Sequence, residues 1–121
     1  MSELMFFDTY AFFEIIRGNP KYSKYDNESA ITTIFNIAEF NFALKREFDI
    51  QTAENYTDKY SQFIIDIDIE DIKKAMTLRI KYRKLSMPDA IGYTIAQKYN
   101  IKFLTGDEEF KNFPNVEFVK K

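Results

Sequence analysis

Short apolar runs that alternate with helix-like segments constrain this chain more than any other feature of its sequence. Leu4 to Phe7, Ser29 to Thr33, Ile101 to Leu104 and Val116 to Val119 are typical of short strands, and Ile64 to Ile67 is a candidate fifth. Strands without polar alternation are expected where helices cover both faces of a sheet. The pattern predicts an α/β fold with three layers, α/β/α, around a central, mainly parallel sheet of four to five short strands.

Helical periodicity accounts for most of the remaining sequence. The expected helices are Tyr10 to Arg17, Ile34 to Phe48, Thr52 to Phe63, Glu70 to Lys84, Met87 to Tyr99 and a short one from Asp107 to Asn112. Residues 20–28 are polar and are expected to be irregular or to form one short helix. The 121 residues, 45% of them hydrophobic, predict a single domain over residues 1–121.

Cysteine and histidine are both absent from the sequence. Their absence excludes disulfides, thiol catalysis, Ser-His-Asp triads and Cys/His zinc sites. The available polar groups are carboxylates, hydroxyls, Lys, Arg and the backbone, and carboxylate oxygens suit hard ions such as Mg²⁺ and Mn²⁺. No signal peptide or membrane span is evident, so we expect a cytoplasmic protein.

Four acids are expected to converge at one edge of the predicted sheet. Asp8 ends the first strand, and Asp107 follows the strand Ile101 to Leu104. Asp89 lies in the first turn of a helix that should begin at the same edge, while Glu39 lies on the helix from Ile34. Ligands of parallel sheets bind beyond the carboxyl ends of the strands, which is where these side chains should meet.

Glu39 is the acid whose position is hardest to explain without a cation. At about 100° per residue it lies about 40° from Phe35 and about 60° from Phe42, on or beside the apparent apolar stripe of its helix. A carboxylate there is costly if unpaired, so it requires a metal ion or a partner such as Arg46. Each of the four acids also has a structural alternative: Asp8 and Asp107 could cap helices, Ser86-Met87-Pro88-Asp89 fits a capping box, and Glu39 could extend to water from the edge of its stripe.

Electrostatic repulsion favours a cation at the cluster as a whole. Two carboxylates about 5 Å apart repel by about 3 kcal/mol at an effective dielectric constant near 20. We therefore expect Mg²⁺ or Mn²⁺ to raise the melting temperature of the protein.

Several stretches together resemble the PIN-domain ribonucleases, especially the VapC-type toxins of prokaryotic toxin–antitoxin pairs. The matching stretches, in the order of the family, are Met5-Phe6-Phe7-Asp8-Thr9, Ile31-Thr32-Thr33 through Ile37-Ala38-Glu39, Ser86-Met87-Pro88-Asp89-Ala90-Ile91 with Ala96, and Phe103-Leu104-Thr105-Gly106-Asp107-Glu108-Glu109-Phe110. They span nearly the whole chain, with Gly92-Tyr93 standing where small aliphatic residues are common. Tyr93 could narrow the pocket, touch substrate or simply pack.

The resemblance implies a PIN-like fold and a Mg²⁺- or Mn²⁺-dependent endoribonuclease. The acidic quartet of the family maps onto Asp8, Glu39, Asp89 and Asp107, as metal ligands and catalytic groups, with Thr9 and Thr105 in support. Hydrolysis would leave a 5′-phosphate and a 3′-hydroxyl. We expect Asp8 and Asp89 as primary ligands, Asp107 as a second ligand or water orienter, and Glu39 as a ligand or base.

Substrate and partners are the least constrained part of the interpretation. Arg79, Lys81, Arg83 and Lys84 lead toward Asp89 and are candidate RNA contacts, although they could equally be a solvated helix end; Lys45-Arg46 is weaker. A toxin of this type implies a cognate antitoxin protein and a homodimer, contacts that aromatics such as Tyr10, Phe12, Phe13 and Tyr22 could serve unless they are core. The alternatives are a PIN nuclease of RNA processing or repair, and a catalytically silent PIN-like binding module.

Overall fold

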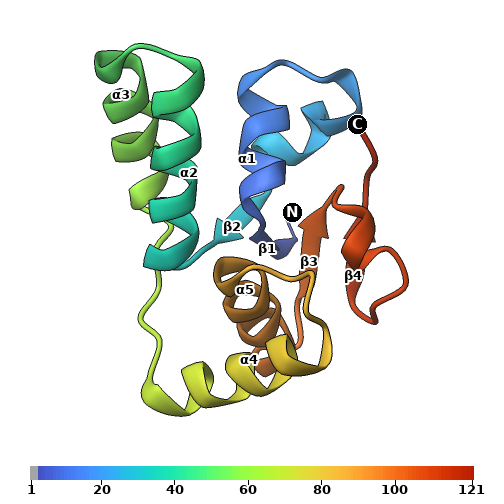
Figure 1. Ribbon diagram of the computed structural model, residues 1–121. Coiled ribbons are helices and arrows are strands. Elements are labelled where there is room, and N and C mark those ends of the chain that lie inside the picture. Colours follow the sequence, from blue (N-terminus) through green and yellow to red (C-terminus); the bar gives the residue numbers. More distant parts are fainter. Residues whose placement is uncertain (1–2) are drawn as a thin grey trace.

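A parallel four-stranded sheet forms the centre of the molecule in the computed structural model, which describes residues 3–121 (Figure 1). The strands lie in the order β2-β1-β3-β4, and every neighbouring pair is parallel. Their bounds are β1 Leu4–Phe7, β2 Ser29–Ile31, β3 Lys102–Thr105 and β4 Val116–Phe118. The predicted strands at both ends of the chain are therefore confirmed to within a residue or two.

Helices fill the intervals between the strands. The α-helices are α1 Thr9–Ile16, α2 Ile34–Glu47, α3 Ile50–Ser61, α4 Ile69–Lys81 and α5 Met87–Lys98. Two 3₁₀-helices, η1 Pro20–Asn27 and η2 Glu108–Phe110, occupy the segments expected to be irregular or shortly helical. Within residues 3–121 no helix is long and apolar enough to cross a membrane.

Successive side chains of β1 pack into two apolar clusters, one on each face of the sheet. Met5 and Phe7 pack with Phe12 of α1 and Phe40 of α2 on one face. On the other face Phe6 stacks on Phe103 of β3, with ring centroids 5.6 Å apart, in the cluster that includes α5. Period-two alternation sends successive side chains to opposite faces, so the predicted arrangement of helices on both sides of the sheet is confirmed.

The candidate strand at Ile64 to Ile67 is wrong. Within residues 3–121, only an isolated parallel bridge between Thr32 and Ile64 extends the sheet beyond β2. Two hydrogen bonds hold it, from the Thr32 amide to the Phe63 carbonyl and from the Ile65 amide to the Thr32 carbonyl. The chain then leaves the sheet edge and begins α4, where the Asp68 side chain caps the helix by accepting from the Asp71 backbone amide. Ile65 and Ile67 still pack against the core, which explains their apolar character without a strand.

The expected apolar stripe of α2 faces outward. Phe35 is 40% exposed and Phe42 is 64% exposed, whereas Ile37, Phe40 and Leu44 are buried. The helix is apolar on more than one arc, so periodicity alone did not identify the arc that contacts the core. Glu39 lies at the half-buried boundary between the two arcs, so the apolar stripe from which its need for a cation was argued was misassigned.

The aromatic residues considered as partner contacts are largely core. Phe12, Phe13 and Tyr22 are buried, and Tyr10 is half-buried. Tyr93 is buried on the α5 side of the sheet, where it packs edge-on against Phe103 and its hydroxyl donates to the Pro114 carbonyl at 2.6 Å. Packing is therefore the role of Tyr93, and the pocket-narrowing alternative is wrong.

Candidate metal centre

The carboxyl edge of the sheet positions the first and last of the four acids. Asp8 follows β1 directly, and its backbone amide donates to the Leu104 carbonyl of β3 at 3.1 Å. Asp107 follows β3 by two residues and accepts from the Glu109 amide to cap η2. The chain places β2 on one side of β1 and β3 on the other side, so β1 and β3 form a topological switch point of the parallel sheet. Crevices at such switch points are the usual ligand sites of parallel sheets.

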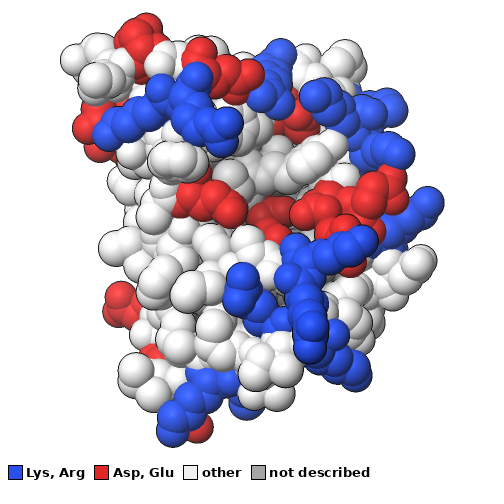
Figure 2. All heavy atoms as spheres, viewed as in Figure 1, with Lys and Arg blue, Asp and Glu red and all other residues white. Residues whose placement is uncertain are grey.

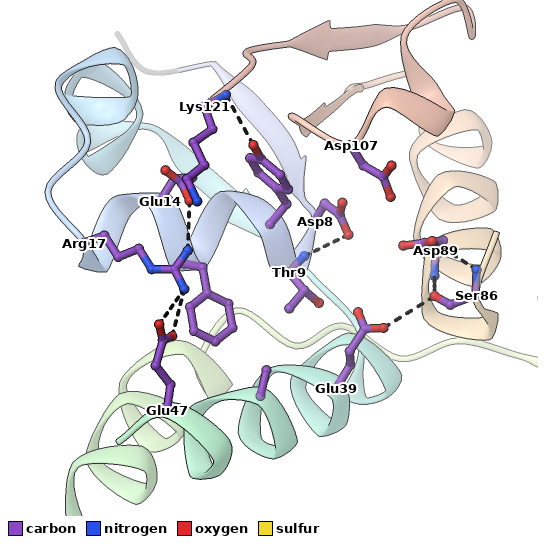
Figure 3. Close-up of a pocket in the computed structure, with 13 residues that line it drawn as sticks. Asp8, Thr9, Glu14, Arg17, Glu39, Glu47, Ser86, Asp89, Asp107 and Lys121 are labelled. Carbon is purple, nitrogen blue, oxygen red and sulfur yellow. Dashed lines mark hydrogen bonds and ion pairs between the residues drawn. The ribbon is translucent and has the colours of Figure 1, made fainter. Parts of the chain in front are cut away.

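Two helices complete the cluster from outside the sheet. Glu39 projects from the second turn of α2, and Asp89 lies in the first turn of α5 (Figure 3). Asp8, Glu39 and Asp89 each offer a carboxylate oxygen, and these oxygens all lie within 4.8 Å of one another. Asp107 lines the same groove but is not one of these three.

Hydrogen bonds fix the orientation of the Asp8 carboxylate. One oxygen accepts from the Thr9 amide at 2.8 Å, and the other accepts from the Thr105 hydroxyl at 2.7 Å. The Thr105 hydroxyl also accepts from the Asp107 amide at 3.1 Å. Thr105 therefore links the two acids that end β1 and β3. Thr9 supports Asp8 through its backbone, while its own hydroxyl donates to the Asn36 carbonyl at 3.4 Å.

A capping box holds Asp89. The Asp89 amide donates to the Ser86 hydroxyl at 3.1 Å, and the Asp89 carboxylate accepts from the Ser86 amide at 3.0 Å. The Ser86 hydroxyl in turn donates to Glu39 at 3.4 Å. Ser86 was expected only as a cap, and its bridge to Glu39 was missed because it joins residues 47 positions apart.

Burial and mutual repulsion make the anionic cluster costly. Burial, reinforced by the nearby Asp89 carboxylate, raises the pKa of Asp8 well above its usual range. Burial, together with the charges of Glu39 and Asp107, raises the pKa of Asp89 to about 6. Among residues 3–121, no Lys or Arg forms an ion pair with any of the four acids.

The donor set fits a hard divalent cation. It consists of carboxylate oxygens alone, which suit Mg²⁺ or Mn²⁺ better than the softer metals that select sulfur or imidazole. A cation would also offset the repulsion that raises the pKa of Asp8 and Asp89. Arg46, the alternative partner for Glu39, instead lies over the Phe42 ring, 5.7 Å from its centroid.

The acids line one end of a groove of about 440 Å³ between α1 and α2. At its other end Arg17 joins the two helices, donating to Glu14 at 3.1 Å and to both Glu47 oxygens at 2.8 Å. Figure 2 shows acidic side chains gathered in a central hollow, with Lys and Arg side chains above and below it. The hollow therefore combines an acidic floor with basic margins.

The predicted basic residues lie on the surface, in the stretch of sequence just before Ser86 and Asp89. Arg79, Lys81, Arg83 and Lys84 are exposed, and the Arg79 side chain donates to the Leu85 carbonyl at 3.1 Å, which secures the turn before Ser86. Lys45 pairs with Glu54 at 3.0 Å.

Comparisons with known proteins agree with this architecture. The sequence matches the family model described as PIN domain over residues 5–116. No curated protein matches the sequence.

Three solved structures share the fold. A toxin–antitoxin complex from Klebsiella pneumoniae matches with 22% identity, 95% coverage of each chain and a TM-score of 0.70. VapBC2 from Rickettsia felis, bound to a DNA fragment from its promoter, matches with 16% identity, 97% coverage of this chain, 98% of that chain and a TM-score of 0.72. PAE2754 from Pyrobaculum aerophilum matches with 17% identity, 99% coverage of this chain, 92% of that chain and a TM-score of 0.69. At these identities the likeness is one of fold.

Proposed function

The chain belongs to the PIN-domain family, and on that premise we propose that it is a Mg²⁺- or Mn²⁺-dependent endoribonuclease. The observation that carries the proposal is the set of Asp8, Glu39 and Asp89 oxygens within 4.8 Å of one another, without a basic partner among the described residues. A chain without Cys or His has few other means of hydrolysing a phosphodiester.

Each acid has a distinct place in the proposed mechanism. Asp8, Glu39 and Asp89 would hold the cation, and Asp107, at the rim of the same groove, would orient water or add a ligand. When bound, the cation would supply an activated water and neutralise charge on the scissile phosphate. Thr105 keeps Asp8 in place through its 2.7 Å hydrogen bond, and the burial of Asp8 excludes bulk water from one side of the cluster.

RNA is the proposed substrate because the acidic hollow has basic margins. A polyanion needs cations along its backbone, and the exposed side chains of Arg79, Lys81, Arg83 and Lys84 lie in the segment that leads into Ser86 and α5. Cleavage would add water across the phosphodiester and leave a 5′-phosphate and a 3′-hydroxyl.

Asparagine variants test the proposal. Asp8→Asn and Asp89→Asn should lose Mn²⁺-dependent cleavage of a single-stranded RNA by at least about 100-fold, because each removes a charged ligand. They should also lose the Mn²⁺-induced rise in melting temperature. Both readouts are compared in Mn²⁺ and in EDTA.

Asp49→Asn is the matched control, since Asp49 caps α3 by accepting from the Thr52 amide at 2.8 Å but lies away from the groove. It should keep both properties. Full cleavage by purified Asp8→Asn would contradict the proposed site, and a wild-type protein that binds Mn²⁺ without cleaving RNA would favour a silent binding module.

We propose that the nuclease is the toxin of a toxin–antitoxin pair, acting in the cytoplasm and forming a homodimer. The support is the fold shared with proteins of toxin–antitoxin complexes and the exposed apolar arc of Ile34, Phe35 and Phe42 on α2, which offers a surface for a protein partner. Expression should arrest growth for the wild type but not for Asp8→Asn, and co-expression of the product of an adjacent small gene should relieve the arrest. Harmless wild-type expression would favour an RNA-processing or repair nuclease.

A further inference from the structure

The three acids of the proposed metal site come from three different helical elements. Asp8 caps α1, Glu39 belongs to α2 and Asp89 belongs to α5. No two of them are closer than 31 residues in sequence, so their 4.8 Å clustering depends on how these helices are held together. A group that contacts all three elements at once would control the geometry of the site.

Asn36 is such a group. It lies one turn before Glu39 on α2 and is fully buried. Its side-chain amide donates to the Pro88 carbonyl, next to Asp89, at 3.2 Å. Its backbone carbonyl accepts from the hydroxyl of Thr9, the first residue of α1, at 3.4 Å. One residue thus connects the helix of each acid.

Local contacts fix the orientation of the Asn36 side chain. The Thr33 hydroxyl donates to the side-chain oxygen Oδ1 of Asn36 at 2.6 Å. The same hydroxyl accepts from the backbone amide of Asn36 at 3.3 Å. The Pro88 carbonyl can only accept, so the Asn36 Nδ2 must face it. A buried side-chain amide whose oxygen and nitrogen are both hydrogen-bonded has one defined position. Its hydrogen bond to the Pro88 carbonyl therefore holds the start of α5 at a fixed place relative to α2.

We propose that Asn36 is a positioning residue, which sets the separation of Glu39 and Asp89 and thereby the affinity of the site for a divalent cation. The inference rests on the proposed function. Groups that orient metal ligands without touching the metal typically change metal affinity or activity by about 10- to 100-fold when they are removed.

Asn41 provides a matched control on the same helix. Its side-chain amide donates to Glu54 at 3.0 Å and to the Thr57 hydroxyl at 2.8 Å, so it connects α2 to α3 away from the acids. Asn36→Leu and Asn41→Leu each delete a carboxamide that bridges α2 to a neighbouring helix. Only the first bridge ends beside Asp89.

Mn²⁺ binding to the purified full-length protein is the decisive measurement. The electron paramagnetic resonance signal of free Mn²⁺ reports binding without any need for turnover. Asn36→Leu should bind Mn²⁺ about 10- to 100-fold more weakly than the wild type, while Asn41→Leu should bind it equally well, even if both lower the melting temperature of the metal-free protein. Should Asn36→Leu fail to fold by circular dichroism, Asn36→Ala, which also deletes the carboxamide and offers no polar side-chain atom to bridge to Pro88, is read in the same way.

The possible failures are distinguishable. Wild-type Mn²⁺ affinity in a folded Asn36 variant, or an equal loss in Asn41→Leu, would overturn the positioning role and leave the proposed function intact. Absence of Mn²⁺ binding by the wild type would overturn both.

Discussion

At the scale of single residues, three of the four acids of the proposed metal site also take part in helix capping. Asp8 caps α1, Asp89 belongs to the capping box of α5 and Asp107 caps η2. Each ionised carboxylate has about four acceptor sites, so one or two backbone hydrogen bonds leave capacity for a cation. The capping alternatives are therefore correct as local structure and compatible with a metal site, because the cap is what orients each carboxylate.

The metal-free protein should show the electrostatic cost of Asp89 in its pH dependence. The folded-state pKa of Asp89 is raised from its ordinary 3.8 to about 6, mainly by burial. The folded protein therefore holds the proton more tightly than the unfolded chain, so the ionisation cost of Asp89 is absent below about pH 4 and fully present above about pH 6. Asp89→Asn should raise the free energy of unfolding by roughly 1–3 kcal/mol at pH 8, with a gain that vanishes toward pH 4.

Urea denaturation in EDTA at several pH values measures this effect. The exposed cap Asp49 lacks this cost, because the Thr52 amide lowers its pKa, so Asp49→Asn should show no gain at pH 8. A stability difference between Asp89→Asn and wild type that stays constant from pH 4 to pH 8 would rule out ionisation of Asp89 as its source.

At the scale of elements, Gly92 determines how closely α5 approaches the sheet. A Cβ at this position would lie 2.7 Å from the Phe6 ring of β1 and 3.2 Å from the Phe103 ring of β3. Both rings are fully buried and stacked on each other, which leaves them little room to move. Gly costs about 1 kcal/mol relative to Ala inside a helix. At this position the missing side chain permits the close packing that brings the start of α5 to the sheet edge.

Gly92→Ala should therefore destabilise the protein despite the better helix propensity of alanine. Overpacking costs about 1–3 kcal/mol, so the net loss should be up to about 2 kcal/mol in chemical denaturation. Thr77→Ala on the exposed face of α4 should be close to neutral. An increase in stability for Gly92→Ala would mean that α5 can move outward at no cost.

At the scale of the whole molecule, acidic and basic side chains occupy different parts of the surface, although the net charge is only −2. Acids occupy the hollow and cations its margins (Figure 2). Net charge alone therefore underestimates the capacity of this surface for a polyanion, because a phosphate backbone samples the potential within about 10 Å at ordinary salt.

The basic segment from the last residue of α4, Lys81, to Lys84 should contribute to RNA affinity in a salt-dependent way. Replacing Lys81, Arg83 and Lys84 with Ala should weaken binding of a single-stranded RNA about tenfold or more at low salt. It should also reduce the slope of log K against log[salt] by about 0.7 for each phosphate that the protein no longer neutralises. The comparison is a fluorescence anisotropy titration with Asp8→Asn as the background, so that the RNA stays intact.

Lys73→Ala with Lys74→Ala removes two exposed cations from an earlier part of α4 and should leave the slope unchanged. An equal effect of both sets would mean that the RNA responds to overall charge rather than to this segment.

Sequence alone determined the local structure and the chemistry available to the chain. Alternating strands and helices, the cap residues and the acids at strand ends were all readable because each depends on residues within about one helical turn. Absence of Cys and His restricted the donor atoms to oxygen before any geometry was known. A mainly parallel sheet of four to five strands, and the arrival of Asp8 and Asp107 at one edge of it, followed from these local rules.

Tertiary structure alone decided which surfaces meet. It turned Phe35 and Phe42 of α2 to solvent and Phe40 to the core, reduced the candidate strand at Ile64 to a single bridge and gathered Asp8, Glu39 and Asp89, but not Asp107, within 4.8 Å. It also placed Asn36 where three helices converge. The physical reason is that burial and long-range hydrogen bonds depend on partners tens of residues away, and the free energy of packing a whole helix outweighs the small local preferences that sequence patterns report.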